Sequence, residues 1–170
     1  MHELGSVENS CWNQQNDDGS PGLNLAARWG HTAVVKLLLE KEGVEVNSQD
    51  RDGRTPLSRA AEFGKSEVVK LLLEKEGVEV DSQDKHGRTP LSKAAVCGHL
   101  EVVKLLLEKE GVDVNSQDRA GKTPLSWAAE FEHRAVVKLL LEKGGVDVER
   151  DGRTSLASAA LRGIHGILLL

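Results

Sequence analysis

Apolar and polar positions in this chain follow a pattern that recurs every 34 residues. Residues 52–85 reappear as residues 86–119 with only nine differences, and every Val, Leu and Ala of the first copy is kept in the second. A third copy begins at Ala120, and a fourth begins at Asp151 after a spacing of 31 residues. The sequence therefore predicts a repeat array with units at 18–51, 52–85, 86–119, 120–150 and 151–170, of which the first is divergent and the last incomplete.

Within one unit, the pattern predicts two helices of different kinds. Thr55 is placed to cap the first helix with its hydroxyl, and Pro56 takes the first helical position, where a missing N–H costs nothing. This helix is short, because Gly64 favours the left-handed conformation that ends helices. The second helix, near residues 66–75, carries Val and Leu over a face too wide to be buried on one side only. We therefore expect it to be packed between the equivalent helices of two neighbouring units.

The segment that leads to the next unit is predicted to form a hairpin. Val-Glu-Val at residues 78–80 alternates between apolar and polar, and residues 81–87 are rich in turn-forming side chains. One unit is too small to exclude water from its apolar face, so the units must stack. The predicted fold is all-α: a solenoid of stacked helix-turn-helix units joined by β-hairpin-like loops.

Both ends of the chain depart from the repeat. Residues 12–19 align with residues 46–53, which predicts that residues 1–17 are a poorly ordered segment or the tail of a decayed repeat. Residues 167–170 align with the start of a second helix and present an apolar face without a polar cap. We therefore expect self-association through this C-terminal end.

Composition narrows the class of protein. The net charge of −5 argues against a nucleic-acid-binding protein held by bulk charge. The longest uninterrupted apolar run, residues 167–170, is far shorter than the roughly 20 residues that a membrane helix needs. Cys11 and Cys97 have no metal-ligand spacing, and no secretion signal follows Met1. We expect an intracellular protein, cytoplasmic or nuclear, that binds neither nucleic acid nor membrane.

The motifs of the unit resemble the ankyrin repeat. They are Thr-Pro-Leu-x-x-Ala-Ala at residues 55–61, a Gly after the first helix, Val-Val-x-Leu-Leu-Leu at residues 68–73, and Gly-Val-Asp-Val-Asn at residues 111–115. A period of 34 also fits the tetratricopeptide repeat, but that family's two long helices with Trp and Tyr at set positions are absent. The resemblance covers residues 18–170 and implies a binding module.

The chain departs from the ankyrin pattern at a few positions. Ser58 and its equivalents stand where the family usually has histidine, so the hydrogen bond of that histidine is weakened or replaced. Glu132 replaces the Gly that ends the first helix of the other units, which predicts a less secure turn in the fourth unit. One extra residue at 74–77 accounts for a period of 34 instead of the usual 33.

Two motifs that suggest ligand chemistry have simpler explanations in the repeat. Gly-Lys-Thr at residues 121–123 resembles the end of a phosphate-binding loop, but the other units carry Gly-Arg-Thr in the same place. A calcium-loop pattern that starts at Ser48 has Arg59 where a bidentate glutamate is needed. We therefore expect no cofactor and no metal.

Candidate catalytic residues are equally sparse. His31, His99 and His133 recur once per unit at the start of a second helix, too far apart to form a catalytic pair or a chelate. Cys97 replaces the phenylalanine of neighbouring units, which indicates a small apolar surface side chain rather than a nucleophile. No constellation supports an enzyme.

Positions that vary between the copies are those where specificity can change without unfolding the array. They cluster at the loop tips and along the first helix. In the ankyrin family such positions usually face a concave groove that contacts partner proteins, and the resemblance implies aromatic anchors there. The residues expected to contact an unidentified protein partner are Trp29, Arg51, Arg54, Arg59, Phe63, Lys85, His86, Arg88, Cys97, Arg119, Lys122, Trp127 and Phe131.

Each set of these residues also has a structural interpretation. The aromatic side chains could cover helix ends inside the solenoid. Arg54, Arg88, Lys122 and Arg153 form a basic row that could be an ordinary solvated stripe. The aspartates expected to neutralise this row in part are Asp50, Asp84 and Asp118.

The function that the sequence favours is a non-catalytic protein–protein interaction module. One alternative is a regulatory or structural segment of a larger multidomain protein, for example downstream of a nucleotide-binding domain, whose groove is filled within the same chain. Another is an array, designed or fragmentary, without a natural partner.

Overall fold

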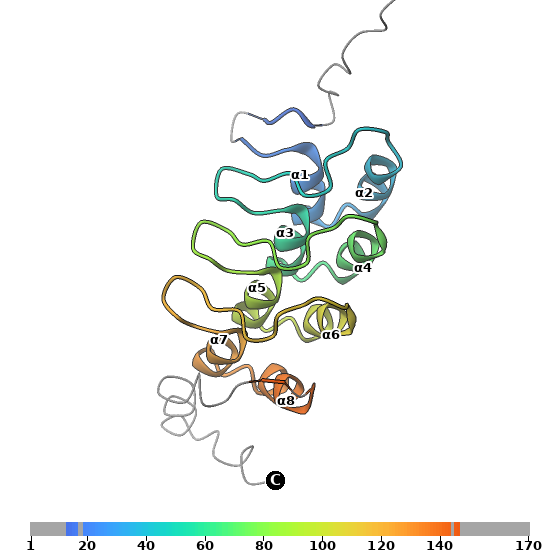
Figure 1. Cartoon of the computed structure of the whole chain (residues 1–170). Helices are drawn as coiled ribbons and strands as arrows, with labels where there is room; N and C mark the ends of the chain where they lie inside the picture. The colour runs from blue at the N-terminus through green and yellow to red at the C-terminus, as the bar shows by residue number, and fades with distance from the viewer. Residues whose placement is uncertain (1–12, 17–18, 144, 147–170) are drawn as a thin grey trace, which may run out of the picture.

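The described chain forms two parallel columns of helices (Figure 1). The structure is a computed structural model that describes residues 13–16, 19–143 and 145–146. Its first-helix column holds α1 (Gly22–Trp29), α3 (Pro56–Glu62), α5 (Pro90–Cys97) and α7 (Pro124–Glu130). Its second-helix column holds α2 (Thr32–Leu39), α4 (Ser66–Glu74), α6 (Leu100–Glu108) and α8 (Arg134–Lys143). The predicted all-α solenoid is confirmed.

Some sequence predictions concern residues outside the described part. These are residues 1–12 and 17 of the N-terminal segment predicted at 1–17, and the incomplete last unit at residues 151–170. Arg153 of the basic row and the apolar end at residues 167–170 belong to that last unit.

The first helices begin as the Thr-Pro motif predicts. The Thr55 hydroxyl accepts a hydrogen bond from the Ser58 backbone N–H at 3.2 Å, and Pro56 is the first helical residue. Ser126 shows how serine replaces the usual histidine, because its hydroxyl accepts from the Thr123 N–H at 2.8 Å while its own N–H donates to the Thr123 hydroxyl. The serine thus closes a reciprocal cap within the turn.

Small and branched side chains make the core of the stack. Ala60 and Ala61 of α3 are completely buried, as are their equivalents in α5, so adjacent first helices approach closely. In α4, Val68, Val69 and Leu72 are buried, and the helix packs against both α2 and α6. The prediction that the second helix is packed between two neighbours is confirmed.

In helix α2, part of the equivalent apolar face is exposed to solvent. Val34 is 46% exposed and Leu37 is 59% exposed, whereas the equivalent Val68 of α4 is 1% exposed. The difference arises because α2 packs against α4 on one side only within the described residues.

The turn between the two helices needs a left-handed residue. Gly30, Gly64 and Gly98 have φ angles of 74°, 64° and 71° at this position. Glu132 takes its place in the fourth unit with φ of 60°, and it is the one described residue other than glycine with positive φ. A side chain with a Cβ is strained there, which gives a physical basis for the less secure turn predicted in this unit.

The predicted strand at residues 78–80 does not form. The loop folds back through a tight turn instead, in which the N–H of Asp84 donates to the Arg88 carbonyl at 3.1 Å and the N–H of Gly87 donates to the Asp84 carbonyl at 2.8 Å. The N–H of Glu79 has no strand partner because it donates to the side chain of Asn47, in the preceding loop, at 2.9 Å. The loops are therefore hairpin-like in course. They are held by these turn bonds, by side chains such as Asn47, and by a backbone bond from the Lys85 N–H to the Asp52 carbonyl of the preceding loop at 2.9 Å.

A ladder of amide side chains connects successive loops. The amide of Asn47 donates to the Gly77 carbonyl at 2.8 Å and accepts from the Glu79 N–H. Asn13 makes the same two bonds to Gly43 and Glu45, one unit earlier. Each asparagine thus satisfies one backbone acceptor and one backbone donor of the next loop.

Asp81 interrupts this ladder. Its Oδ2 accepts from the Asp113 N–H at 2.8 Å, but its Oδ1 has no hydrogen-bond partner within the described residues. Burial raises the pKa of Asp81, and the charge of Asp113 raises it further, against the lowering effect of the Asp113 N–H. An ionised carboxylate cannot donate as the asparagines do.

Replacing Asp81 with asparagine should stabilise the protein. Asp81→Asn supplies the missing donor and should raise the free energy of unfolding at pH 7 by about 1 kcal/mol, the net value of one hydrogen bond. Because the folded pKa of Asp81 is raised, the wild-type side chain contributes fully only below its unfolded value of 3.8 and loses that contribution as the pH rises. The gain should therefore shrink as urea unfolding is repeated at lower pH, and a gain that grows on acidification would contradict the assignment.

Candidate partner-binding surface

In three of the described units, a buried aspartate at the base of the loop joins the loop to the first helix of its unit. Asp50 Oδ1 accepts from the N–H groups of Asp52 at 2.8 Å and Arg54 at 3.0 Å. Asp50 Oδ2 accepts from Arg59 Nε at 2.7 Å, and Arg59 lies on α3. One oxygen thus shapes the loop, and the other fixes the loop on the helix.

The next two units repeat this arrangement with different donors. Lys93 Nζ of α5 lies 2.9 Å from Asp84 Oδ2. Trp127 Nε1 of α7 donates to Asp118 Oδ2 at 3.0 Å. Arginine, lysine and tryptophan at this position therefore share one property, a side-chain N–H that reaches the loop carboxylate.

This geometry changes the interpretation of Arg59. Variation between units suggested that Arg59 presents a charge to a partner, but it is only 9% exposed and its guanidinium is engaged by Asp50. The first unit supports the structural role, because Asn16 replaces the aspartate and Leu25 replaces the donor. Asn16 and Leu25 are both uncharged, so neither requires an ionic partner. Asn16 Oδ1 still accepts a hydrogen bond from the Ser20 N–H at 2.8 Å.

The charge of Lys93 also acts on Asp84. Burial alone would raise the pKa of Asp84, but the Lys93 ammonium and the N–H of Arg88 outweigh it and hold the pKa of this carboxyl below 3.8. The stability contributed by the ionised carboxylate is therefore present above pH 3.8 and is lost as the pH falls through the lower folded pKa.

A row of exposed apolar side chains follows the ends of the first helices. Trp29, Phe63 and Phe131 are 61%, 39% and 50% exposed, and Cys97 is exposed at the equivalent position of the third unit. We call these four residues the apolar row. Although the residue is exposed, its thiol is partly buried, and this burial and the charge of Glu62 raise the pKa of Cys97. The thiol is therefore protonated at neutral pH and is a poor nucleophile.

Cations stack on these aromatic rings. The guanidinium carbon of Arg28 lies 5.1 Å from the ring centroids of both Trp29 and Phe63. In the fourth unit, Lys122 Nζ lies 4.1 Å from the Trp127 ring, which in turn stacks on Phe131 at a centroid distance of 6.0 Å. The aromatic groups thus form two clusters, one at each end of the apolar row.

The basic row is largely paired, although not with the aspartates that the sequence suggested. Arg54 pairs with Asp52 at 3.3 Å and with Glu62 at 3.7 Å, and Lys122 pairs with Glu130. Only Arg88 approaches one of the loop-base aspartates, with its Nε 4.0 Å from Asp84 Oδ2. The loop tips carry the remaining predicted residues, all exposed: Arg51, Lys85, His86 and Arg119.

Comparison with known families decides the identity of the array. A family model described as ankyrin repeats (3 copies) matches residues 5–84, 23–118 and 110–170. The chain belongs to the ankyrin repeat family. A comparison with curated proteins gave no match.

Ankyrin repeats generally mediate protein–protein contacts rather than catalysis. No group of three or more His, Cys, Asp or Glu side chains within the described part of this array is placed to hold a metal ion. Three hollows between successive second helices and turns have volumes of about 220, 200 and 260 Å³. These are smaller than typical small-molecule sites. None of the helices described has the length and apolarity to cross a bilayer.

The histidines of this ankyrin array join one unit to the previous one. His99 Nε2 lies 3.1 Å from the Glu62 carbonyl, and His133 Nε2 lies 2.9 Å from the Val96 carbonyl. Their rings lie over Gly64 and Gly98, where a Cβ would meet the ring at 2.7 Å and 2.5 Å. The sequence placed these histidines at helix starts, but it did not reveal the bond to the neighbouring unit.

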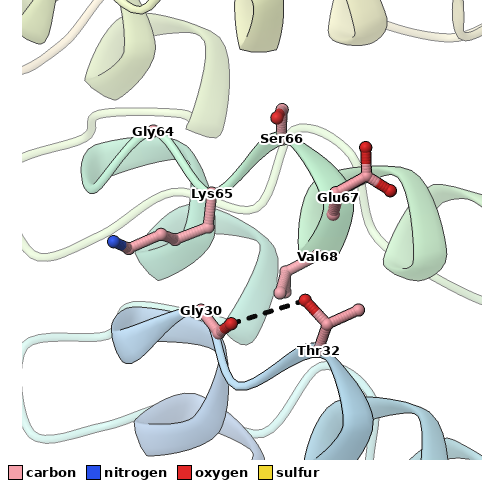
Figure 2. A pocket seen from close by; sticks show the side chains of 7 residues that line it. All are labelled: Gly30, Thr32, Gly64, Lys65, Ser66, Glu67 and Val68. Atoms are coloured by element: carbon pink, nitrogen blue, oxygen red, sulfur yellow. Dashed lines mark hydrogen bonds between the residues drawn. The ribbon is translucent and has the colours of Figure 1, made fainter.

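Lysine replaces this histidine between the first two units. Lys65 crosses Gly30 but has no ring nitrogen, and a hollow of about 220 Å³ remains there, lined by Thr32, Ser66 and Val68 among others (Figure 2). Gly30 and Gly64, which follow Trp29 and Phe63 in the sequence, also line the hollow.

A histidine at residue 65 should fill this hollow. The backbone of Lys65 has φ and ψ of −84° and 71°, close to the −79° and 78° of His99, so Lys65→His fits without strain. The new ring can bond to the first helix of the preceding unit, and we expect the free energy of unfolding to rise by about 1 kcal/mol.

Urea unfolding followed by circular dichroism measures the effect. Lys70→His, on the exposed side of α4, is the matched control and should change stability by less than about 0.5 kcal/mol. Equal effects of the two substitutions would contradict the role assigned to the histidines.

Proposed function

We propose that this ankyrin array is a non-catalytic module that binds a partner protein through the concave face of loops and first helices. The observation that carries the proposal is the apolar row, because large apolar side chains are exposed on a frame whose core does not include them. Exposed aromatic groups of this kind are enriched where proteins bind one another.

The anchors of the interface are the aromatic residues at the two ends of the apolar row. Trp29 and Phe63 lie at one end, and Trp127 and Phe131 lie at the other. Cys97 contributes a smaller apolar contact between them. Around these anchors, the polar rim consists of Arg51, Arg54, Lys85, His86, Arg88, Arg119 and Lys122.

Charge favours a protein partner over a nucleic acid. Nucleic-acid binding depends on cations that neutralise phosphates. Here Arg54 and Lys122 are already paired with carboxylates of the same face, and the chain as a whole is acidic. The few cations that remain suit the separate charged groups of a protein better than a continuous phosphate backbone.

Removing two exposed rings should abolish partner binding without lowering the thermal stability of the protein. Phe63→Ala combined with Phe131→Ala should abolish capture of the partner, because buried aromatic anchors each contribute about 2 kcal/mol or more at an interface. The thermal midpoint should change little, since both rings are exposed in the free protein.

The measurement is affinity capture with tagged wild-type and variant chains, alongside thermal unfolding. A double substitution on the outer side, Lys70→Ala with Lys104→Ala, is the control and should retain the partner. A large fall in thermal midpoint for the phenylalanine variant would show that the rings are structural, and retained capture would show that the interface lies elsewhere.

A further inference from the structure

The spacing of the apolar row carries information about the shape of its ligand. Each unit contributes one exposed apolar side chain at the end of its first helix, from Trp29 to Phe131. Packed helices lie about 8–10 Å apart, so the row repeats at about that interval. A ligand that lies along the row must present an apolar side chain at the same interval.

In only one regular backbone conformation are successive side chains on the same face separated by about this interval. In a polyproline II segment, every third residue faces the same way, at a repeat of about 9 Å. In a strand, every second residue faces the same way, at about 6.6 Å, and in an α-helix the same face recurs at about 5.4 Å. A strand or helix would therefore place intervening side chains between the units.

The charge beside the row favours an acidic ligand. Arg28 is held between the rings of Trp29 and Phe63 but forms no ion pair within the described part of the chain. Stacking on rings leaves the edge of a guanidinium available to a carboxylate. This arrangement orients a cation toward the ligand before binding.

Further along, the basic residues recur with the same period as the apolar row. Arg88 has a distant ion pair with Asp84, at 4.0 Å, and its guanidinium carbon lies 5.9 Å from the Trp127 ring centroid. The exposed loop tips carry Lys85 and Arg119. Of the nearby carboxylates, Glu62 is engaged with Arg54, Arg59 and Lys93, and Glu130 is engaged with Lys122. Arg28, Lys85 and Arg119 form no ion pair within the described part of the chain, so basic groups remain to meet a ligand, although the chain as a whole is acidic.

A polyproline II ligand has no internal hydrogen bonds, so it can use the arginine donors of this surface. Its backbone carbonyls are free to accept hydrogen bonds, whereas those of a helix are already used. Arginine side chains along the row can therefore bind both the carboxylates and the backbone of such a ligand.

We propose that the surface binds one extended acidic segment of a partner protein in the polyproline II conformation, with an apolar residue at every third position. The apolar side chains lie on the apolar row from Trp29 to Phe131, and the carboxylates face Arg28, Arg88 and the loop tips. This inference rests on the proposed function and adds the chemistry of the ligand.

The test is isothermal titration of the full chain with a capped peptide of five Leu-Pro-Glu triplets. Two matched peptides are the controls: one with the same composition in which leucine does not recur at every third position, and one with lysine in place of glutamate. The triplet peptide should bind at least about tenfold more tightly than either control.

Variants of the chain locate the binding. Arg28→Ala and Phe63→Ala should each weaken binding of the triplet peptide by about tenfold or more, whereas Lys70→Ala on the outer side should not change it. Equal binding of the rearranged or lysine peptide, or no binding of the triplet peptide at about 1 mM, would overturn the inference.

Failure of the proposed function would look different. If an acidic helical peptide binds more tightly than the triplet peptide and loses affinity in Phe63→Ala, the surface is an interface but not for an extended ligand. If capture of the partner also survives the phenylalanine substitutions, the proposed function itself fails.

Discussion

A buried carboxylate at the base of three loops, from Asp50, Asp84 or Asp118, determines where the candidate surface lies. Asp50 and Asp84 each use one oxygen to hold two backbone N–H groups of the loop and the other to hold a cation on the first helix. The loop and the helix are therefore one rigid unit, and every side chain presented by either is fixed relative to the other. Without this bond, the stacked helices would still exclude water, but the loops would be held only by their own turns and by the bonds between successive loops.

The same bond explains how the surface changes from unit to unit without cost to the fold. Arg59 and Lys93 satisfy the carboxylate with buried cations, whereas Trp127 satisfies it with an indole N–H and brings a ring to the surface. In the fourth unit the ring then stacks with Phe131 and Lys122. A single exchange at a structural position thus creates one of the two aromatic clusters.

Much of the fold could be predicted from the sequence, because the contacts that form it are local or repeat in register. The Thr55 cap, the left-handed glycines and the packing of α4 between two neighbours follow from patterns inside one unit. The roles of Arg59 and His99 could not be predicted in this way. Each depends on a bond to a backbone or side chain whose position is known only after the loops and units are assembled.

The strand predicted at residues 78–80 was wrong for a related reason. Apolar and polar residues do alternate there, but the N–H of Glu79 donates to the Asn47 side chain of the preceding loop and not to a strand partner. For the surface itself, comparison of the repeats found exposed rings such as Phe63 and Phe131. It also selected Arg59, since variation between copies does not distinguish a partner contact from an exchange of equivalent donors.

A double-mutant cycle on Asp50 and Arg59 tests the central claim most directly. The first unit supplies the substitutions, Asp50→Asn and Arg59→Leu, because Asn16 and Leu25 occupy these positions there. Each single change leaves a buried charge without its partner, so the double variant should be more stable than the sum of the singles implies, with a coupling energy of about 1–3 kcal/mol. The exposed pair Glu101 and Lys104, 3.5 Å apart, should give less than about 0.5 kcal/mol in a parallel cycle. Additive effects at Asp50 and Arg59, no larger than those of the exposed pair, would contradict the account.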